Sequence, residues 1–198
     1  MEWCVMKDIK GTQTEKNVLT AFAGESQARN RYTFYAKQAK KDGFIFVREI
    51  FEETAWQEAA HAKRLFGFLQ GGQAEITGAF PAGVIADTYN NLLESAAGEH
   101  HEWAEMYPTM AEVAEKEGFP EIAFTMRKIL TAEDYHEKRF LDLAKMIKNN
   151  TMFNNEKETI WRCLHCGCLV EGKSAPKVCP VCQHPTAYFV RLNHLIDN

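Results

Sequence analysis

Apolar residues recur at helical spacing along most of the chain, and the clearest case is near its start. Val18 and Phe22 are four positions apart, so they would lie on the same face of a helix. The residues Thr12-Gln13-Thr14-Glu15 before them have the form of a capping box, and Asp42-Gly43 after them is a stop signal. The pattern therefore predicts a helix over about 12–42.

The same reasoning predicts three further helices. Gly71-Gly72 would end the first of them, and Pro120 suits the first turn of the last. Pro108 lacks the amide hydrogen that a helix interior needs, so the helix that contains it should be kinked there. The predicted ranges are about 46–70, 87–117 and 120–149.

A stretch without helical periodicity, from Gly71 to about Ala86, separates the second helix from the third. It is too long for a tight turn and long enough to cross the length of a helix bundle. After about residue 150 the chain becomes rich in Cys, with Pro and short β-branched or aromatic stretches. We therefore expect a mainly α protein, with a four-helix bundle and a long crossover in residues 1–150 and a small β-rich domain in residues 151–198.

The helical part also repeats itself. Glu58-Ala-Ala-His61-Ala-Lys-Arg recurs as Glu133-Asp-Tyr-His136-Glu-Lys-Arg, and the same offset, within one residue, maps Ala23-Gly24-Glu25 onto Ala97-Gly98-Glu99. Such self-similarity predicts a duplicated helical hairpin with a pseudo-twofold axis.

The repeat places Glu and His at the spacing of metal ligands. Residues three apart lie on one face of a helix, about 4.5 Å apart in rise. A single Glu-x-x-His is weak evidence, because both residues are common on exposed helices. Two copies, plus a Glu on each remaining helix, match the ligands of ferritin-like di-iron and di-manganese bundles. The candidate ligands, which with Tyr32 are also the candidate catalytic residues, are Glu25, Glu58, His61, Glu99, Glu102, Glu133 and His136.

Carboxylate and imidazole ligands suit iron or manganese, and bridging carboxylates would hold two such ions together. Glu102 is surplus to the simple set, since its counterpart in the repeat is Ala28. One hypothesis is that one metal exchanges Glu102, bound when ferric, for His61, bound when ferrous. Tyr32 and its counterpart Tyr107 would either hydrogen-bond a ligating carboxylate or pack in the core.

Two C-x-x-C pairs near the C-terminus form a second candidate metal site. Cys163-Leu-His-Cys166 and Cys179-Pro-Val-Cys182 are separated by twelve residues, which brings four thiolates around one tetrahedral ion. Zinc ribbons and rubredoxin-type iron sites share this geometry. The neighbouring aromatic residues, and a bundle that needs electrons, favour iron, with zinc possible in some preparations. Cys4 and Cys168 are extra, as apolar fillers or free thiols.

Charge and hydropathy limit the partners. The 27 acidic residues outnumber the 23 basic ones and the net charge is -4, so no basic surface is expected to bind nucleic acid. No run of about 18 apolar residues occurs and the first ten residues lack an apolar run, which predicts neither a membrane span nor a signal peptide. Reduced cysteines fit the cytoplasmic location that follows.

These motifs resemble the rubrerythrin family over nearly the whole chain. The stretches that carry the resemblance are 20–32, 58–66, 96–102 and 136–140. The resemblance implies a ferritin-like di-iron domain followed by a rubredoxin-like Fe(Cys)4 domain. It also implies a non-haem peroxidase that reduces hydrogen peroxide to water in oxidative-stress defence. Electrons would come from NAD(P)H through a reductase or a rubredoxin, and the chain would form a homodimer or a higher oligomer, with head-to-tail dimers one arrangement.

The resemblance also assigns roles to residues. The resemblance implies that Glu58 and Glu133 bridge the two irons. One iron would also be bound by Glu25 and by either Glu102 or His61. The other iron would also be bound by Glu99 and His136. The four knuckle cysteines, Cys163, Cys166, Cys179 and Cys182, would hold the single iron. Cys168 departs from the family, which commonly has an aromatic residue there.

Two alternatives stay open at this point. The bundle could oxidise and store iron as a ferritin does, although this leaves the four-cysteine domain without a task. The chain could also be a non-enzymatic scaffold with a zinc ribbon that binds a partner, although this leaves seven clustered ligands unexplained.

Overall fold

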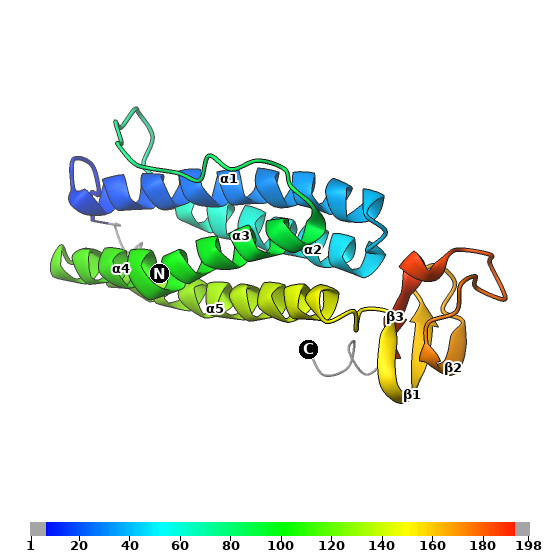
Figure 1. Cartoon of the computed structure of the whole chain (residues 1–198). Helices are drawn as coiled ribbons and strands as arrows, with labels where there is room; N and C mark the ends of the chain where they lie inside the picture. The colour runs from blue at the N-terminus through cyan, green and yellow to red at the C-terminus, as the bar shows by residue number, and fades with distance from the viewer. Residues whose placement is uncertain (1–6, 193–198) are drawn as a thin grey trace. The chain divides into compact units, whose positions relative to one another are not determined.

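The computed structural model describes residues 7–192, so Cys4 lies outside the described part of the chain. The described chain is mainly helical, with a small antiparallel sheet near its C-terminus (Figure 1). None of the described helices combines the length and the apolar composition that a membrane span requires. In chain order the elements are α1 (Gln13–Lys41), α2 (Ile45–Phe66), α3 (Thr88–His101), the π-helix η1 (Glu102–Met106), α4 (Tyr107–Lys116), α5 (Pro120–Lys148), β1 (Asn154–Cys163), β2 (Leu169–Ser174), the 3-10 helix η2 (Thr186–Tyr188) and β3 (Phe189–Arg191).

Helix α1 begins and ends at the predicted signals. The backbone N–H of Glu15 donates to Oγ1 of Thr12 at 3.1 Å, and the Glu15 carboxylate accepts from the N–H of Gly11 at 2.8 Å. The first bond satisfies an amide that the first turn of the helix leaves without a partner, and the second ties the chain just before the helix to that turn. Gly43 follows the helix with a φ of 85°, a conformation that favours glycine.

Helix α2 ends at Phe66, earlier than the predicted range of 46–70. The N–H of Phe68 bonds to the carbonyl of Leu65 at 3.0 Å, and that of Leu69 to the carbonyl of Phe66 at 3.1 Å. These are bonds to the third preceding residue, so the chain tightens out of the α-helix. The tightening buries Phe68 in the core.

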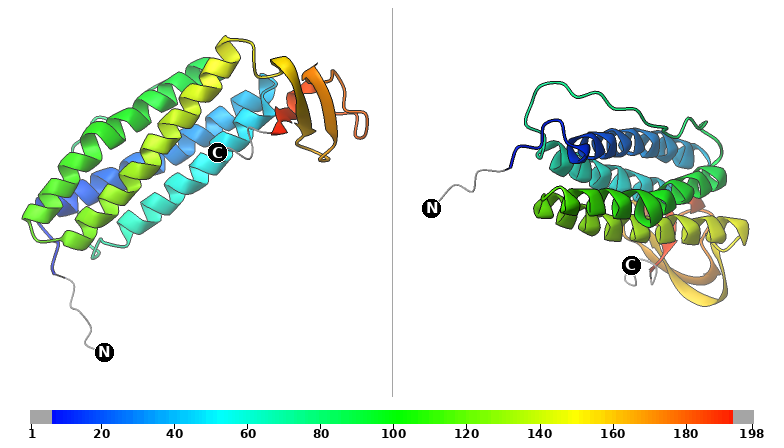
Figure 2. Two further views of the ribbon diagram at one scale, coloured as in Figure 1. Left: turned by 90° about the horizontal axis from the view of Figure 1, so that it is seen from below. Right: turned by 90° about the vertical axis from the view of Figure 1, so that its left-hand side faces the viewer.

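The long connection between α2 and α3 is the predicted crossover. In Figure 1 and Figure 2 its residues 71–83 pass along α1. The side-chain amide of Gln27 on α1 donates to the carbonyl of Pro81 at 2.9 Å, and Gly78 approaches Thr20 of the same helix. The two helical hairpins are therefore joined by a crossover along α1, as expected.

The third predicted helix is divided by the π-helix η1, directly before Pro108 in the first turn of α4. The internal repeat slips at this place, because Glu99 follows Glu25 by 74 residues whereas Tyr107 follows Tyr32 by 75. One extra residue in a helix is commonly accommodated as a π-bulge. The helix is thus interrupted by a π-helix directly before the proline, and the kink expected at Pro108 itself stays a prediction.

Packing divides the described helices into two compact units. Each unit contains parts of α1, of α2, of the helix that α3 begins, and of α5. The first unit comprises residues up to 31, 54–83 and 96–138, and its core includes Val18, Leu65, Tyr107, Phe119 and Met126. In the second unit, the aromatic ring of Phe140 lies 5.3 Å from Tyr32 and 5.2 Å from Phe51, measured between ring centroids. The predicted domain boundary at residue 150 stays a prediction.

The C-terminal sheet has the strand order β2-β1-β3, with both pairs antiparallel. Trp161 on β1 pairs with Val170 on β2 and with Arg191 on β3. A small core of Trp161, Cys163, Cys179 and Phe189 is buried beside the sheet. The fold prediction is confirmed: the protein is mainly α, with a four-helix bundle and a small β-rich cysteine domain.

Candidate metal centres

Two groups of side chains in the bundle could each hold a metal ion, and both lie within the first compact unit. In each group the ligand atoms lie within 4.8 Å of one another. The first group is Glu25, Glu58, His61 and Glu133, and the second is Glu58, Glu99, Glu133 and His136. Glu58 and Glu133 belong to both groups, which is the arrangement expected of carboxylates that bridge two cations.

The two oxygens of each shared carboxylate face different imidazoles. Oε2 of Glu58 lies 3.2 Å from Nδ1 of His61, and Oε1 lies 3.1 Å from Nδ1 of His136. In the same way, Glu133 places Oε1 3.1 Å from His61 and Oε2 2.8 Å from His136. Each carboxylate therefore spans the space between the two histidines.

The helical repeat explains why six residues far apart in the sequence meet here. Glu58 and His61 on α2, and Glu133 and His136 on α5, are three apart and so share a helix face. The remaining two carboxylates come one each from α1 and α3, namely Glu25 and Glu99. Each of the four long rods thus contributes ligands.

Burial makes the site costly without cations. Glu58 and Glu133 are 0% exposed, and Glu25 and His136 are 1% exposed. Several of their atoms are buried without a hydrogen-bond partner, namely Oε2 of Glu25, Oε1 of Glu58, both oxygens of Glu133 and Nδ1 of His136. Buried polar atoms of this kind cost free energy unless something satisfies them. Two hard or borderline cations such as iron or manganese would do so, and the oxygen and nitrogen donors fit them.

The pKa values of the clustered carboxylates and histidines also indicate that the site favours bound positive charge. Burial, with repulsion from Glu133 and Glu58, raises the pKa of Glu25. Burial, with repulsion from Glu58, raises the pKa of Glu99 to about 8. Burial would lower the pKa of His136, but the carboxylates of Glu133 and Glu58 close to its Nδ1 raise it to about 12. The cluster therefore takes up protons where a loaded site would have metal.

Two neighbours orient the ligands. Oε1 of Gln57 lies 2.9 Å from Nε2 of His136, so Nε2 carries a hydrogen, and with metal bound the lone pair of Nδ1 would face the site. The hydroxyl of Tyr107 donates to Oε1 of Glu25. The sequence left open whether Tyr107 would bond a carboxylate or only pack. It did not single out Gln57, because the contact joins α2 to α5 and leaves no local pattern.

The structure places Glu102 and Tyr32 differently from the six clustered ligands. Glu102 begins η1 and is in neither group; its pKa is raised by burial and then by the nearby charges of Glu99 and Glu133. Tyr32 packs its buried ring against Phe140. The expected roles of these two residues, as exchangeable ligand and as hydrogen-bond donor, stay predictions.

A surface pocket of about 510 Å³ reaches the first group. His61, whose side chain is 16% exposed, lines this pocket. The other walls come from α2 and α5 and include an ion pair of Arg64 and Glu121 at 2.6 Å. A small polar molecule could therefore approach the site from the His61 side.

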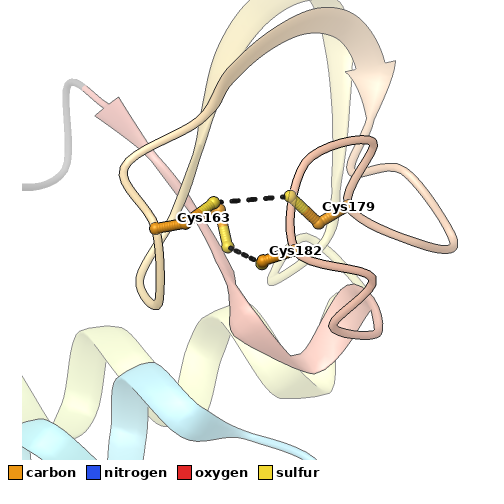
Figure 3. A group of neighbouring side chains, drawn as sticks. Cys163, Cys179 and Cys182 are labelled. Atoms are coloured by element: carbon orange, nitrogen blue, oxygen red, sulfur yellow. Dashed lines mark hydrogen bonds between the residues drawn. The ribbon is translucent and has the colours of Figure 1, made fainter.

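The four knuckle cysteines converge as predicted, and Figure 3 labels three of them, Cys163, Cys179 and Cys182. Sγ of Cys163 lies 3.6 Å from Sγ of Cys182, and Sγ of Cys166 lies 3.6 Å from Sγ of Cys179. A disulfide would require about 2.05 Å. Sulfurs bound to one tetrahedral ion at about 2.3 Å would instead lie about 3.8 Å apart. The spacing fits a four-thiolate metal site.

Backbone N–H groups donate hydrogen bonds to the sulfurs of Cys179 and Cys166. Hydrogen bonds from the N–H groups of Cys182 and Val181 lower the pKa of the Cys179 thiol to about 6. The N–H of Cys168 acts in the same direction on the Cys166 thiol, whose pKa is nevertheless raised overall by burial and by the neighbouring sulfurs of Cys179 and Cys163. Such donors favour the thiolate form, which is the form that binds metal.

A helical bundle with two carboxylate-bridged metal positions, followed by a four-thiolate knuckle domain, defines a ferritin-like di-iron protein with a rubredoxin-like domain. The model of the family described as Rubrerythrin matches residues 16–144, and that of the rubrerythrin rubredoxin-like domain matches residues 161–190. The chain belongs to the rubrerythrin family, which is a family of oxidoreductases.

Individual relatives and solved structures agree. Rubrerythrin of Nitratidesulfovibrio vulgaris is 60% identical over 184 residues, which cover 93% of this chain and 96% of that protein. Rubrerythrin of Porphyromonas gingivalis is 52% identical over 183 residues, covering 92% of each chain. The structure of fully reduced nigerythrin superposes with a TM-score of 0.62 at 26% identity, covering 92% of this chain and 91% of that one. A bacterioferritin structure from Desulfovibrio desulfuricans, with a TM-score of 0.62 at 17% identity over 70% of this chain and 81% of that one, shares the fold.

Proposed function

We propose that this protein is a peroxidase that reduces hydrogen peroxide to water at the di-iron site, with electrons delivered through the four-cysteine iron. The observation that carries the proposal is the position of Glu58 and Glu133 between His61 and His136. The chemistry that two ferrous ions supply when bound is one electron each, and these with two protons turn one peroxide into two waters.

Within this proposal, Glu58 and Glu133 are the residues that both irons would share. Glu25 and His61 complete one position, with Glu102 as the alternative to His61. Glu99 and His136 complete the other position. The geometry of the two groups supports this assignment, since both shared carboxylates turn one oxygen toward each histidine.

The protein's own groups have three tasks in the proposed reaction. Buried carboxylates stabilise the positive charge that grows as electrons leave. Tyr107 fixes the orientation of Glu25, and Glu102, with its raised pKa, is placed to hold and deliver a proton. The pocket beside His61 admits a molecule as small as peroxide while the rest of the site stays closed to water.

The electron path needs partners. We propose that residues 1–150 carry out the peroxide chemistry and residues 151–198 pass on single electrons. The donor would be a rubredoxin or an NAD(P)H-dependent reductase in the cytoplasm. A homodimer or higher oligomer could bring the four-cysteine site of one copy to the di-iron site of another. No nucleic acid or membrane takes part in this scheme.

Stopped-flow mixing of the anaerobically reduced holoprotein with hydrogen peroxide tests the proposal. We expect rapid oxidation with one peroxide consumed per two di-iron electrons, and turnover when a donor is supplied. Glu133→Gln removes a shared ligand and should slow the oxidation by about 10²-fold or more. The matched control is Glu112→Gln on the exposed face of α4, which should react as the wild type does.

The two competing functions predict other results. A ferroxidase would consume added ferrous iron and oxygen and accumulate ferric mineral, with slow reaction toward peroxide. A zinc-ribbon scaffold would be colourless, whereas ferric thiolate absorbs visible light. Either outcome in the wild-type protein would contradict the peroxidase proposal.

A further inference from the structure

A small cluster of side chains ties the π-helix η1 to α5 beside the metal centres. Nε1 of Trp103, the second residue of η1, donates to Oε2 of Glu137 on α5 at 2.5 Å. Nδ1 of His100 lies 3.1 Å from Oε1 of the same carboxylate, and its ring packs edge-on against Trp103, with the ring centroids 5.0 Å apart. The side chain of Glu137 is only 16% exposed, so this contact is largely shielded from water.

Each member of the cluster directly follows a candidate metal ligand in the sequence. The three pairs are Glu99 and His100, Glu102 and Trp103, and His136 and Glu137. Consecutive residues of a helix point about 100° apart, so a residue next to a ligand does not share its direction. Neither of the two metal-binding groups of the bundle includes a member of the cluster. The cluster therefore holds the helices that carry the ligands without being part of the ligand set.

The internal repeat gives the cluster a counterpart that lacks this contact. With the offsets that map Glu99 onto Glu25 and Glu133 onto Glu58, the corresponding positions of the first half hold Ser26, Arg29 and Ala62. Ala62 stands in the place of Glu137 and has no acceptor in its side chain. The half that has the hydrogen bond is also the half that has η1 and the surplus carboxylate of Glu102.

We propose that Trp103 and Glu137 are positioning residues for Glu102, whose place beside the metal site is fixed by their hydrogen bond between η1 and α5. Glu102 and Trp103 are consecutive in η1, so a bond that fixes the rotation of one relative to α5 fixes the other. A π-helix is an uncommon conformation, and a side-chain bond to a neighbouring helix stabilises it. This inference rests on the proposed function and deepens it, because it concerns how the alternative ligand to His61 is held.

Hydrogen exchange of the metal-free, full-length protein tests whether the bond holds η1. Trp103→Phe removes the N–H donor and keeps an aromatic ring, and Glu137→Ala removes the acceptor. In both variants we expect the backbone amides of η1 to exchange at least about tenfold faster than in the wild type, with those of α1 unchanged. Glu137→Gln keeps an acceptor oxygen and should stay within about threefold of the wild type.

The midpoint potential of the di-iron site tests whether the bond acts through Glu102. A nearby carboxylate stabilises ferric over ferrous iron, so its displacement favours the ferrous form. At a fixed potential, Trp103→Phe and Glu102→Gln should each raise the ferrous-to-ferric ratio at least about threefold. The double variant should stay within about twofold of Glu102→Gln alone, because the bond then has no carboxylate to position. Mössbauer spectra of the iron-loaded, full-length protein distinguish these irons from the thiolate-bound iron.

Trp56→Phe is the matched control, because Trp56 is 76% exposed on α2, and it should change neither measurement. Unchanged exchange of η1 or an unchanged potential in Trp103→Phe would overturn the inference. A full additional effect of Trp103→Phe in the Glu102→Gln protein would also overturn it. If Trp103→Phe does not retain iron, Glu137→Ala takes its place with the same expectations. A wild type that fails to reduce peroxide while both measurements give the expected results would refute the proposed function alone.

Discussion

The hydroxyl of Tyr107 donates a hydrogen bond to Oε1 of Glu25, and the two residues come from opposite halves of the internal repeat. Burial and the charge of Glu25 raise the pKa of Tyr107, so the phenol keeps its hydrogen and stays a donor. The bond occupies one oxygen of Glu25 and leaves Oε2, which is buried without a hydrogen-bond partner, for the metal site.

Replacing Tyr107 with Phe should therefore weaken the Glu25 side of the site. We expect the fold to persist, because the ring stays, and metal affinity or the rate of peroxide oxidation to fall about 10- to 100-fold. Iron titration of the metal-free protein and stopped-flow oxidation measure the two effects. Tyr89→Phe, at the start of α3, is the control. Wild-type values for Tyr107→Phe would show that the hydrogen bond does not orient the ligand.

We expect Gln57 to affect metal binding only through its contact with His136. Gln57→Met keeps the length of the side chain but removes the acceptor for Nε2 of His136. The imidazole can then adopt the other tautomer, so we expect weaker metal binding at the second group, by about 10- to 100-fold. The iron content after dialysis against a chelator measures this. Gln38→Met on α1 should retain the full complement of iron, and loss of iron in both variants would contradict the assignment.

Glu99 should have opposite effects on the metal-free and the loaded protein. Burial and repulsion from Glu58 oppose its negative charge, as its raised pKa shows. Glu99→Gln removes this cost, so the metal-free variant should be more stable than the metal-free wild type by about 1–3 kcal/mol at neutral pH. With iron the order should reverse, because a ligand is lost. Thermal unfolding with chelator and with iron checks both signs.

We expect Glu117, which lies away from the metal sites, to make the stability of the fold depend on pH. Its carboxylate accepts from the N–H groups of Gln13 at 3.2 Å and Thr14 at 2.8 Å, at the start of α1. The hydrogen bond from the Thr14 hydroxyl is the main cause of its lowered pKa. A carboxyl group whose pKa is lower in the folded than in the unfolded state stabilises the protein at pH values above its unfolded-state pKa. This stabilisation is lost as the pH falls through its folded-state pKa. Glu117→Gln should cost at most about 1 kcal/mol at pH 7, since the group is partly exposed.

Denaturant unfolding at pH 7 and at about pH 3 measures the difference. The destabilisation of Glu117→Gln should shrink at the lower pH, because the wild-type carboxyl takes up protons as the pH falls toward its lowered pKa. Glu112→Gln, on the helix α4 that ends directly before Glu117, should show little effect at either pH. A difference between Glu117→Gln and the wild type that is independent of pH would contradict a charge-assisted cap.

The sequence predicted those features that depend on local period and spacing. The capping box at Thr12, the stop at Gly43, the paired Glu-x-x-His runs and the two cysteine knuckles each act within a few residues, so a single helix or loop determines them. The contact of Gln57 with His136 could not be predicted, because it depends on how α2 packs on α5. The early end of α2 depends on the tertiary burial of Phe68, which overrides its helical pattern.

The π-helix did leave a signal in the sequence, in the change of the repeat offset from 74 to 75 residues. Seven residues separate Glu25 from Tyr32, which at about 100° each falls about 20° short of two full turns. Tyr107 follows Glu99 by eight residues, which in a regular helix would place it about 80° past two full turns. The wider loop of η1 absorbs the surplus rotation. The extra residue of the second half, with the rotation that it adds, therefore lies in the same short span as Glu102, the carboxylate for which the first half has only Ala28.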